Sequence, residues 1–275
     1  NIARSGDTII VHPGTYVLPG YGAYKPPVYA VNAYPCITIS QKAITIRSIS
    51  PGDPATVAAT VFEPGWGAYG VFAFENCGRD TVLSGITLRN GLFYGANGQN
   101  GRTSNPVHPA GYDAGGVYGG AIKLYGSSPT ISNCVFRDCG VFAGNGGNAT
   151  VVNNLGYDGG NGGCAGGGAL FVYYASPLLQ NTTFVNCQAV AGNGGNGAEG
   201  DNRYGRGGSY KVWSSNSGGA GTRIERQGAG GAVLVAGGNP EFEDCTFEGC
   251  YVSSGASGVG SSPYIQGETG LIPMD

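Results

Sequence analysis

The chain has 275 residues, a formal net charge of −3 and only 11% charged side chains, while 54 of its residues are glycine. So small a charge produces no long-range field that would attract nucleic acid, which excludes a nucleic-acid-binding role. No apolar stretch reaches the roughly 20 residues that span a bilayer, and regular runs of Val, Ile and Phe separate the chain from disordered proteins.

The N-terminal part predicts strands from its first residues onward. The chain enters a strand at 7–11 almost directly, so we expect a partial or processed form of a longer precursor. Further strand runs follow at 37–39 and 43–46, and residues 72–91 align with the next segment as a degenerate repeat. We therefore expect a single domain over 1–275 with about five coils.

A twenty-residue pattern occurs three times without insertion, at 120–139, 168–187 and 231–250. Each copy begins with Gly-Ala and carries proline at its tenth, phenylalanine at its seventeenth and cysteine at its twentieth position. Within each copy, apolar and polar side chains alternate with the period of two that is typical of strands with one buried face. The pattern predicts an all-β fold in which each unit is buried by stacking on its neighbours.

Equivalent positions in such repeats must stack in parallel, about 4.8 Å apart. We therefore expect ladders of like side chains along the axis. These are a corner ladder of Asn133, Asn181 and Asp244, an inner ladder of Phe136, Phe184 and Phe247, and a cysteine ladder of Cys139, Cys187 and Cys250. Stacked amides can satisfy one another's hydrogen bonds, and neighbouring ladder cysteines are within disulfide range, which would join Cys187 to Cys139 or Cys250.

The three strings GGAIKLYGSSPTISNCVFRDC, GGALFVYYASPLLQNTTFVNC and GGAVLVAGGNPEFEDCTFEGC resemble the right-handed parallel β-helix repeat of pectate-lyase-like and bacterial surface proteins. The opening GDTIIVHPGTY is similar to the N-terminal coils of the same superfamily. The resemblance implies a single-stranded right-handed parallel β-helix. It does not fix the function, because this superfamily contains lyases, hydrolases, epimerases, adhesins and structural proteins.

Long glycine-rich insertions leave the coil at one corner, near 95–116, 142–166 and 190–228. Insertions at one repeat position gather on one side of a solenoid, which is commonly its binding face, although glycine-rich segments are also tolerated as surface excursions. The segment Tyr157-Asp158-Gly159-Gly160 comes near a calcium-binding nonapeptide without its period, so calcium is a minor alternative to the absence of any cofactor or metal. Asn148-Ala149-Thr150 is a candidate glycosylation acceptor.

The insertion over 203–226 combines basic and aromatic residues that suit a sugar ring and a uronate carboxylate. As ligand-binding candidates it offers Arg203, Tyr204, Arg206, Tyr210, Lys211 and Trp213. If the chain is a lyase, Lys211 or Tyr210 would act as base beside Arg206. The alternative interpretation is that these charges only solubilise a long loop.

The polygalacturonase-like members of the superfamily resemble one another in paired aspartates, a Gly-His-Gly and an Arg-x-Lys, and this sequence contains none of these motifs. We therefore expect a non-enzymatic extracellular or cell-surface β-helix protein with a structural, adhesive or filament- or layer-forming role. It could assemble end to end, because open coil ends expose strand edges, or through lateral contacts. The alternative is a polysaccharide-active enzyme, a uronate lyase or epimerase, or a carbohydrate-binding module that uses the 203–226 loop.

Overall fold

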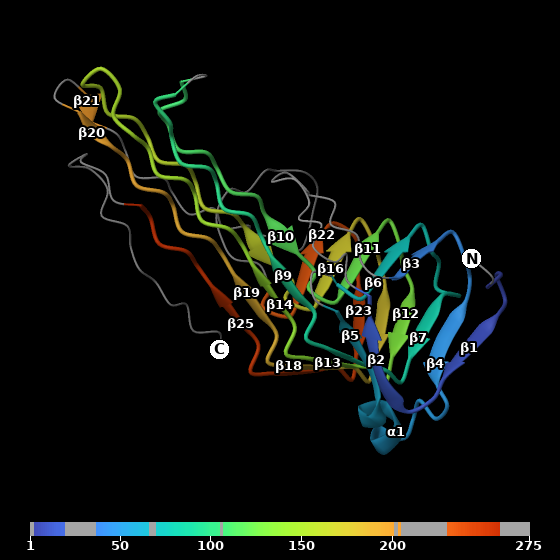
Figure 1. Cartoon of the computed structure of the whole chain (residues 1–275). Helices are drawn as coiled ribbons and strands as arrows, with labels where there is room; N and C mark the ends of the chain where they lie inside the picture. The colour runs from blue at the N-terminus through green and yellow to red at the C-terminus, as the bar shows by residue number, and fades with distance from the viewer. Residues whose placement is uncertain are drawn as a thin grey trace.

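The computed structural model describes residues 3–19, 37–65, 70–104, 107–200, 203–204 and 230–258. These residues wind into a solenoid of parallel strands, and long extended segments project from one side of it (Figure 1). The predicted all-β parallel solenoid is confirmed. Within the described residues, no helix is both long and apolar enough to cross a bilayer.

Four parallel sheets run along the solenoid. Sheet A contains β1 (Thr8–Val11), β4 (Thr45–Ser48), β7 (Val82–Ser84), β12 (Thr130–Ser132), β17 (Leu178–Gln180) and β23 (Glu241–Glu243). Sheet B contains β2 (Gly14–Leu18), β5 (Thr60–Pro64), β8 (Thr87–Arg89), β13 (Val135–Arg137), β18 (Thr183–Val185) and β24 (Thr246–Glu248). Sheet C contains β3 (Ile37–Ser40), β6 (Phe72–Glu75), β11 (Ile122–Tyr125), β16 (Leu170–Tyr173) and β22 (Val233–Ala236). Sheet D contains β9 (Leu92–Tyr94), β14 (Gly140–Phe142), β19 (Gln188–Val190) and β25 (Tyr251–Ser253).

Each repeated coil passes through sheets C, A, B and D in turn, then leaves the solenoid and returns to sheet C. Two of the returning segments pair in parallel, as β10 (Val117–Tyr118) and β15 (Ala165–Gly166), and they pack against sheet D. At the far end of the third excursion, β20 (Glu199–Gly200) and β21 (Arg203–Tyr204) form the antiparallel pair seen in Figure 1. The register follows the repeat, since Ile122 pairs with Leu170 and Leu170 with Val233.

The corners are made by residues in the left-handed region. Between sheets A and B, the backbone φ is 51° at Asn133, 46° at Asn181 and 51° at Asp244. Asn and Asp adopt this conformation more readily than other side-chain-bearing residues. The sharp corner therefore explains why these residue types recur at one position of the repeat.

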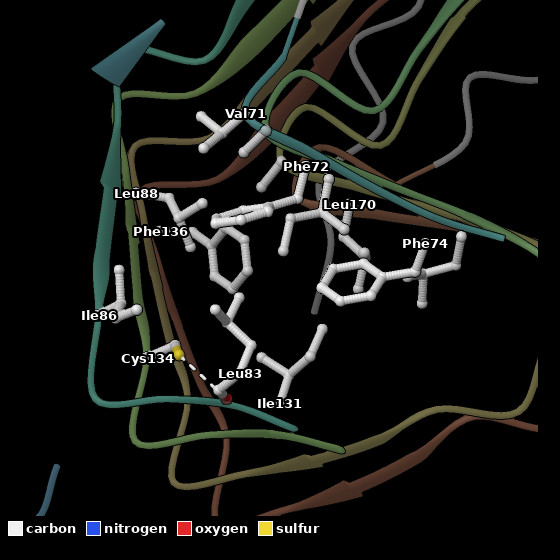
Figure 2. Packing of buried hydrophobic residues seen from close by; sticks show 14 of the residues in the cluster. Val71, Phe72, Phe74, Leu83, Ile86, Leu88, Ile131, Cys134, Phe136 and Leu170 are labelled. Carbon is white, nitrogen blue, oxygen red and sulfur yellow. Dashed lines mark hydrogen bonds between the residues drawn. The ribbon is translucent and has the colours of Figure 1, made fainter. Parts of the chain in front are cut away.

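The core fills the space between the sheets with stacked apolar side chains (Figure 2). The rings of Phe136 and Phe184 lie 4.7 Å apart between centroids and within 8° of parallel, and Phe184 and Phe247 lie 4.9 Å apart at 3°. Phe72 and Phe74 face Leu83 and Ile131 across the same interior (Figure 2). The ladder buries the middle ring, Phe184, between its two neighbours.

One short helix, α1 (Pro54–Ala59), interrupts the all-β pattern. The carboxylate of Asp53 caps it by accepting hydrogen bonds from the backbone N–H groups of Ala55 and Thr56, and Pro54 begins the helix. Proline and an acidic N-cap favour helix initiation even in a short segment. This element did not follow from the strand-like repeat pattern.

Candidate functional site

The glycine-rich excursions form an ordered body, which we call the glycine slab. Its outgoing legs are residues 95–101, 143–149, 191–197 and 254–258, and its returning legs are 109–116 and 157–164. The legs run side by side away from the solenoid as extended segments (Figure 1). The insertions therefore stack on one another as the coils do.

Backbone hydrogen bonds join the legs to one another. Among outgoing legs, the N–H groups of Gly98 and Gly146 donate to the carbonyl oxygens of Asn145 and Asn193, both at 2.8 Å. Between outgoing and returning legs, Gly147 donates to Tyr112 at 2.9 Å and Gly160 donates to Gly147 at 2.8 Å. The outgoing legs thus form one layer of the slab and the returning legs the second.

A period of three residues explains the glycines of the slab. A Cβ atom on Gly147 would lie 1.9 Å from the carbonyl oxygen of Gln99 in the neighbouring leg, and one on Gly146 would lie 2.0 Å from that of Gly160 in the other layer. Gly146 and Gly147 therefore face backbone and need glycine, as residues do at the crowded axis of other three-residue helices. The third position, at Asn145 and Asn148, faces outward and is exposed.

Asparagines at the outward positions form two amide columns, Asn97–Asn145–Asn193 and Asn100–Asn148–Asn196. In each column the side-chain oxygen accepts a hydrogen bond from the backbone N–H of the next asparagine, at 2.8–2.9 Å. The first column extends to the N–H of Ala256 at 2.7 Å. In the second layer Asp113 accepts from Asn161 in the same way, at 2.7 Å.

The amide columns occupy a different place from the corner ladder that the sequence predicts. At that corner, the backbone N–H of Asn133 donates to Gln180 and that of Asn181 to Glu243, both at 2.9 Å. The side chains of Asn133 and Asn181 form no hydrogen bond with each other in the described part of the chain. In the slab, by contrast, the asparagine oxygen substitutes for a backbone carbonyl and holds the next rung.

The cysteine ladder stacks in the core beside the phenylalanines. Cys139 and Cys187 are fully buried and Cys250 is partly buried, and the seven cysteines within the described ranges are thiols rather than disulfides. The contact of the Cys187 thiol with that of Cys139, together with burial, raises the pKa of Cys187. In the neighbouring column Thr182 stands between Cys134 and Cys245, and burial raises the pKa of Cys134 to about 12.

The outward column of sheet C is covered. Lys123, Phe171 and Leu234 are each less than 8% exposed, and the ring of Tyr118 from β10 stacks on Phe171 at 5.1 Å. The ammonium of Lys123 lies 4.5 Å from the ring centroid of Phe93, and burial lowers the pKa of Lys123 to about 8. Tyr118 of β10 and Phe93 of β9 thus contribute to the cover that this column needs.

The ligand-binding candidates of the 203–226 loop are not brought together by any described contact. Arg203 and Tyr204 form β21, of which the backbone alone is described. Arg206, Tyr210, Lys211 and Trp213 lie outside the described residues. Among the residues that the structure describes, no three His, Cys, Asp or Glu side chains gather as metal ligands, and Asp158 of the calcium-like segment lies in a returning leg.

A groove of about 380 Å³ lies between α1 and the outer face of sheet B. Pro51, Pro54 and Val57 form one wall, while Arg137 and the corner amides of Asn133 and Asn181 line the other. Arg89, on the rung before Arg137, is paired with Glu63. Arg137 is exposed and pairs with no other described residue, so the groove carries an available positive charge.

Residues 116–267 match the model of the right-handed β-helix region family. The chain belongs to this family of right-handed parallel β-helix proteins. No curated protein matches the chain. Membership of the family accounts for the solenoid but does not specify a function, so we look to the slab for the role of this chain.

Proposed function

We propose that this chain is a non-enzymatic β-helix protein of the cell surface or extracellular space, with a structural, adhesive or layer-forming role. The glycine slab is its interaction face. The observation that carries the proposal is the order of the slab, since backbone hydrogen bonds join its legs in two layers and the outgoing legs present an exposed asparagine at every third residue, as at Asn145 and Asn148.

A surface of this kind suits contact with a flat partner. Its backbone is fixed by hydrogen bonds between legs, so little conformational freedom would be lost on binding. Insertions that project from one side of a solenoid are also where repeat proteins commonly bind. The solenoid then serves as the rigid support that spaces the legs.

Replacing residues 144–163 by a short Gly-Ser turn tests the proposal, because it removes one outgoing and one returning leg. We expect the intact protein to be retained on cell-wall material or to form assemblies visible by light scattering, and the shortened variant to lose at least most of this activity. Equal retention and equal assembly of the two proteins would contradict an interaction role for the slab.

The groove beside α1 favours carbohydrate binding as the second candidate. The available charge of Arg137 and the amides of Asn133 and Asn181 suit an acidic sugar. Binding to uronate-containing polysaccharides that falls with Arg137→Ala, but not in the shortened slab variant, would support this candidate. Absorbance from unsaturated products during such incubations would support the lyase alternative.

A further inference from the structure

We infer that the outward face of the first slab layer is a self-association surface, on which a second copy of this chain docks through its own amide columns. This inference rests on the proposed function and names the partner of the same surface. It follows from the hydrogen-bonding capacity, the spacing and the charge of the face.

The amide columns have hydrogen-bonding capacity to spare. Asn97, Asn145 and Asn193 use their side-chain oxygens to hold the next leg. Their Nδ2 groups, and those of Asn100 and Asn148, donate to no residue in the described ranges. An amide oxygen has two lone pairs and an amide nitrogen two N–H groups, so columns from two copies are complementary to each other.

The spacing of the columns matches that of a partner with the same repeat. Backbone hydrogen bonds set the separation of the legs at about one strand spacing. A second copy has the same separation by construction, so one amide pair in register places the other pairs in register too. Stacked amide ladders in paired sheets gain stability in this way, and a two-fold interface brings the same patch from both copies together.

The charge distribution selects the first layer over the second. The outgoing legs 95–101, 143–149 and 191–197 contain no charged residue. The returning legs carry Asp113 and Asp158. Two copies can therefore approach through their first layers without the like-charge repulsion that would oppose contact between second layers.

The area of the face limits the affinity. Legs of seven residues at about 3.1 Å per residue, stacked four deep at about 4.8 Å, cover roughly 400 Å² per copy, against about 800 Å² per partner in a stable complex. We therefore expect weak association that depends on concentration, strengthened where several copies join in a layer.

Sedimentation velocity from micromolar to millimolar concentration tests the inference, on protein expressed in bacteria so that Asn148 carries no glycan. We expect the sedimentation coefficient to rise with concentration. The double variant Asn145→Asp/Asn148→Asp keeps both oxygens that hold the next leg, but it replaces two amide donors by negative charges. We expect its dissociation constant to rise by about tenfold or more, because like charges then face each other.

The control variant is Asn153→Asp/Asn154→Asp at the turn of the second excursion. Both residues have positive φ, 51° and 60°, which aspartate tolerates, and they add the same charge away from the face. We expect its dissociation constant to stay within about twofold of the parent value. Hydrogen exchange at Asn193 and Asn196 checks that the slab remains folded in both variants.

Two results would overturn the inference. One is a protein that stays monomeric at every concentration. The other is association of the Asn145→Asp/Asn148→Asp variant equal to that of the parent, which would assign self-association to another surface. Neither result removes the proposed interaction with other partners, because retention on cell-wall material is measured separately with the shortened slab variant.

Discussion

Individual glycines of this chain serve two different physical ends. Gly119, Gly167 and Gly230 have φ near 60°, where a side chain would be strained. Gly147 has no such φ, and its requirement is space, since a Cβ would meet a carbonyl oxygen at 1.9 Å. The sequence shows only that glycine is present, so these two requirements could not be separated before the contacts were known.

Substitution of one slab glycine should open the slab. We expect Gly147→Ala to lower the free energy of local opening by about 1–3 kcal/mol, because the methyl group collides with the backbone of the next leg. Gly115→Ala is the matched control, since its Cβ would have no atom within 4 Å. Hydrogen exchange of the slab amides measures both, and equal protection in the two variants would contradict the close-packed arrangement.

Within the phenylalanine ladder, the middle ring should contribute most to the stability of the protein. Phe184 is fully buried between two parallel rings, so Phe184→Ala should destabilise the protein by about 3–5 kcal/mol. Phe247 is 51% exposed, so Phe247→Ala should cost clearly less. Chemical denaturation gives the free energy of unfolding of both variants. A larger loss of stability in Phe247→Ala than in Phe184→Ala would contradict this prediction.

The ladder thiols should resist modification in the folded protein. The contact with the Cys139 thiol, together with burial, raises the pKa of Cys187, so little reactive thiolate is present at pH 8. We expect maleimide to modify Cys187 only after denaturation, as read by mass spectrometry of peptides. Rapid labelling of native Cys187 would show that the core opens at this rung.

At the scale of elements, strands β9 and β11 meet at a buried charge. Lys123 of β11 lies over Phe93 of β9, and burial lowers its pKa from 10.5 to about 8. Between these two pH values the unfolded chain binds the proton and the folded chain does not. Stability must therefore rise as the pH rises from 8 to 10.5, by about 3 kcal/mol in total.

The variant Lys123→Met removes this titration. We expect its stability to be flat in pH over that window relative to the parent protein, because no proton is released on folding. Thermal unfolding at several pH values between 7 and 10 gives the comparison, and subtracting the two curves cancels tyrosine ionisation common to both. A parallel rise in the two proteins would assign the pH dependence to another group.

The strand elements of the coil followed from the repeat, whereas the slab legs did not. Alternation at Ile122 and Leu124, copied at Leu170 and Val172, is enough to predict parallel strands in register. The string Gly144-Asn145-Gly146-Gly147-Asn148 recurs 48 residues later with the same period of three, which was the available signal for the slab. Such a period has no hydrophobic face, so the usual patterns of burial do not reveal it.

At the scale of the whole molecule, each repeat contributes to both the coil and the slab. The coil should stay folded without one pair of slab legs, whereas each slab leg needs its neighbours. The coil has its own core, whereas slab backbone groups bond to neighbouring legs. Replacing residues 144–163 by a short turn should therefore leave the sheets intact by circular dichroism. Gly98 and Gly195 should lose hydrogen-exchange protection, since their carbonyl partners lie on the removed legs. Loss of the strand signal instead would mean that the coil needs the slab.

The candidate site could be predicted only in outline. The positions of the insertions and their common side follow from the offset of 48 residues between copies. The paired layers do not, because they depend on hydrogen bonds such as Gly160 to Gly147, between segments with no recognisable pairing pattern. The basic and aromatic residues of the 203–226 loop remain a prediction.

The three-residue period separates the glycines that the packing of the slab requires from the asparagines that the slab exposes. Gly146 and Gly147 are committed to contact with backbone, while the outward Asn145 holds the next leg through its side-chain oxygen. Replacement of Asn by Asp, Ser or Thr at these sites would therefore change the charge and the hydrogen-bonding groups of the exposed face without changing the backbone arrangement. Duplication of one repeat would add one more leg to each layer of the slab, and the legs already present would keep their side chains.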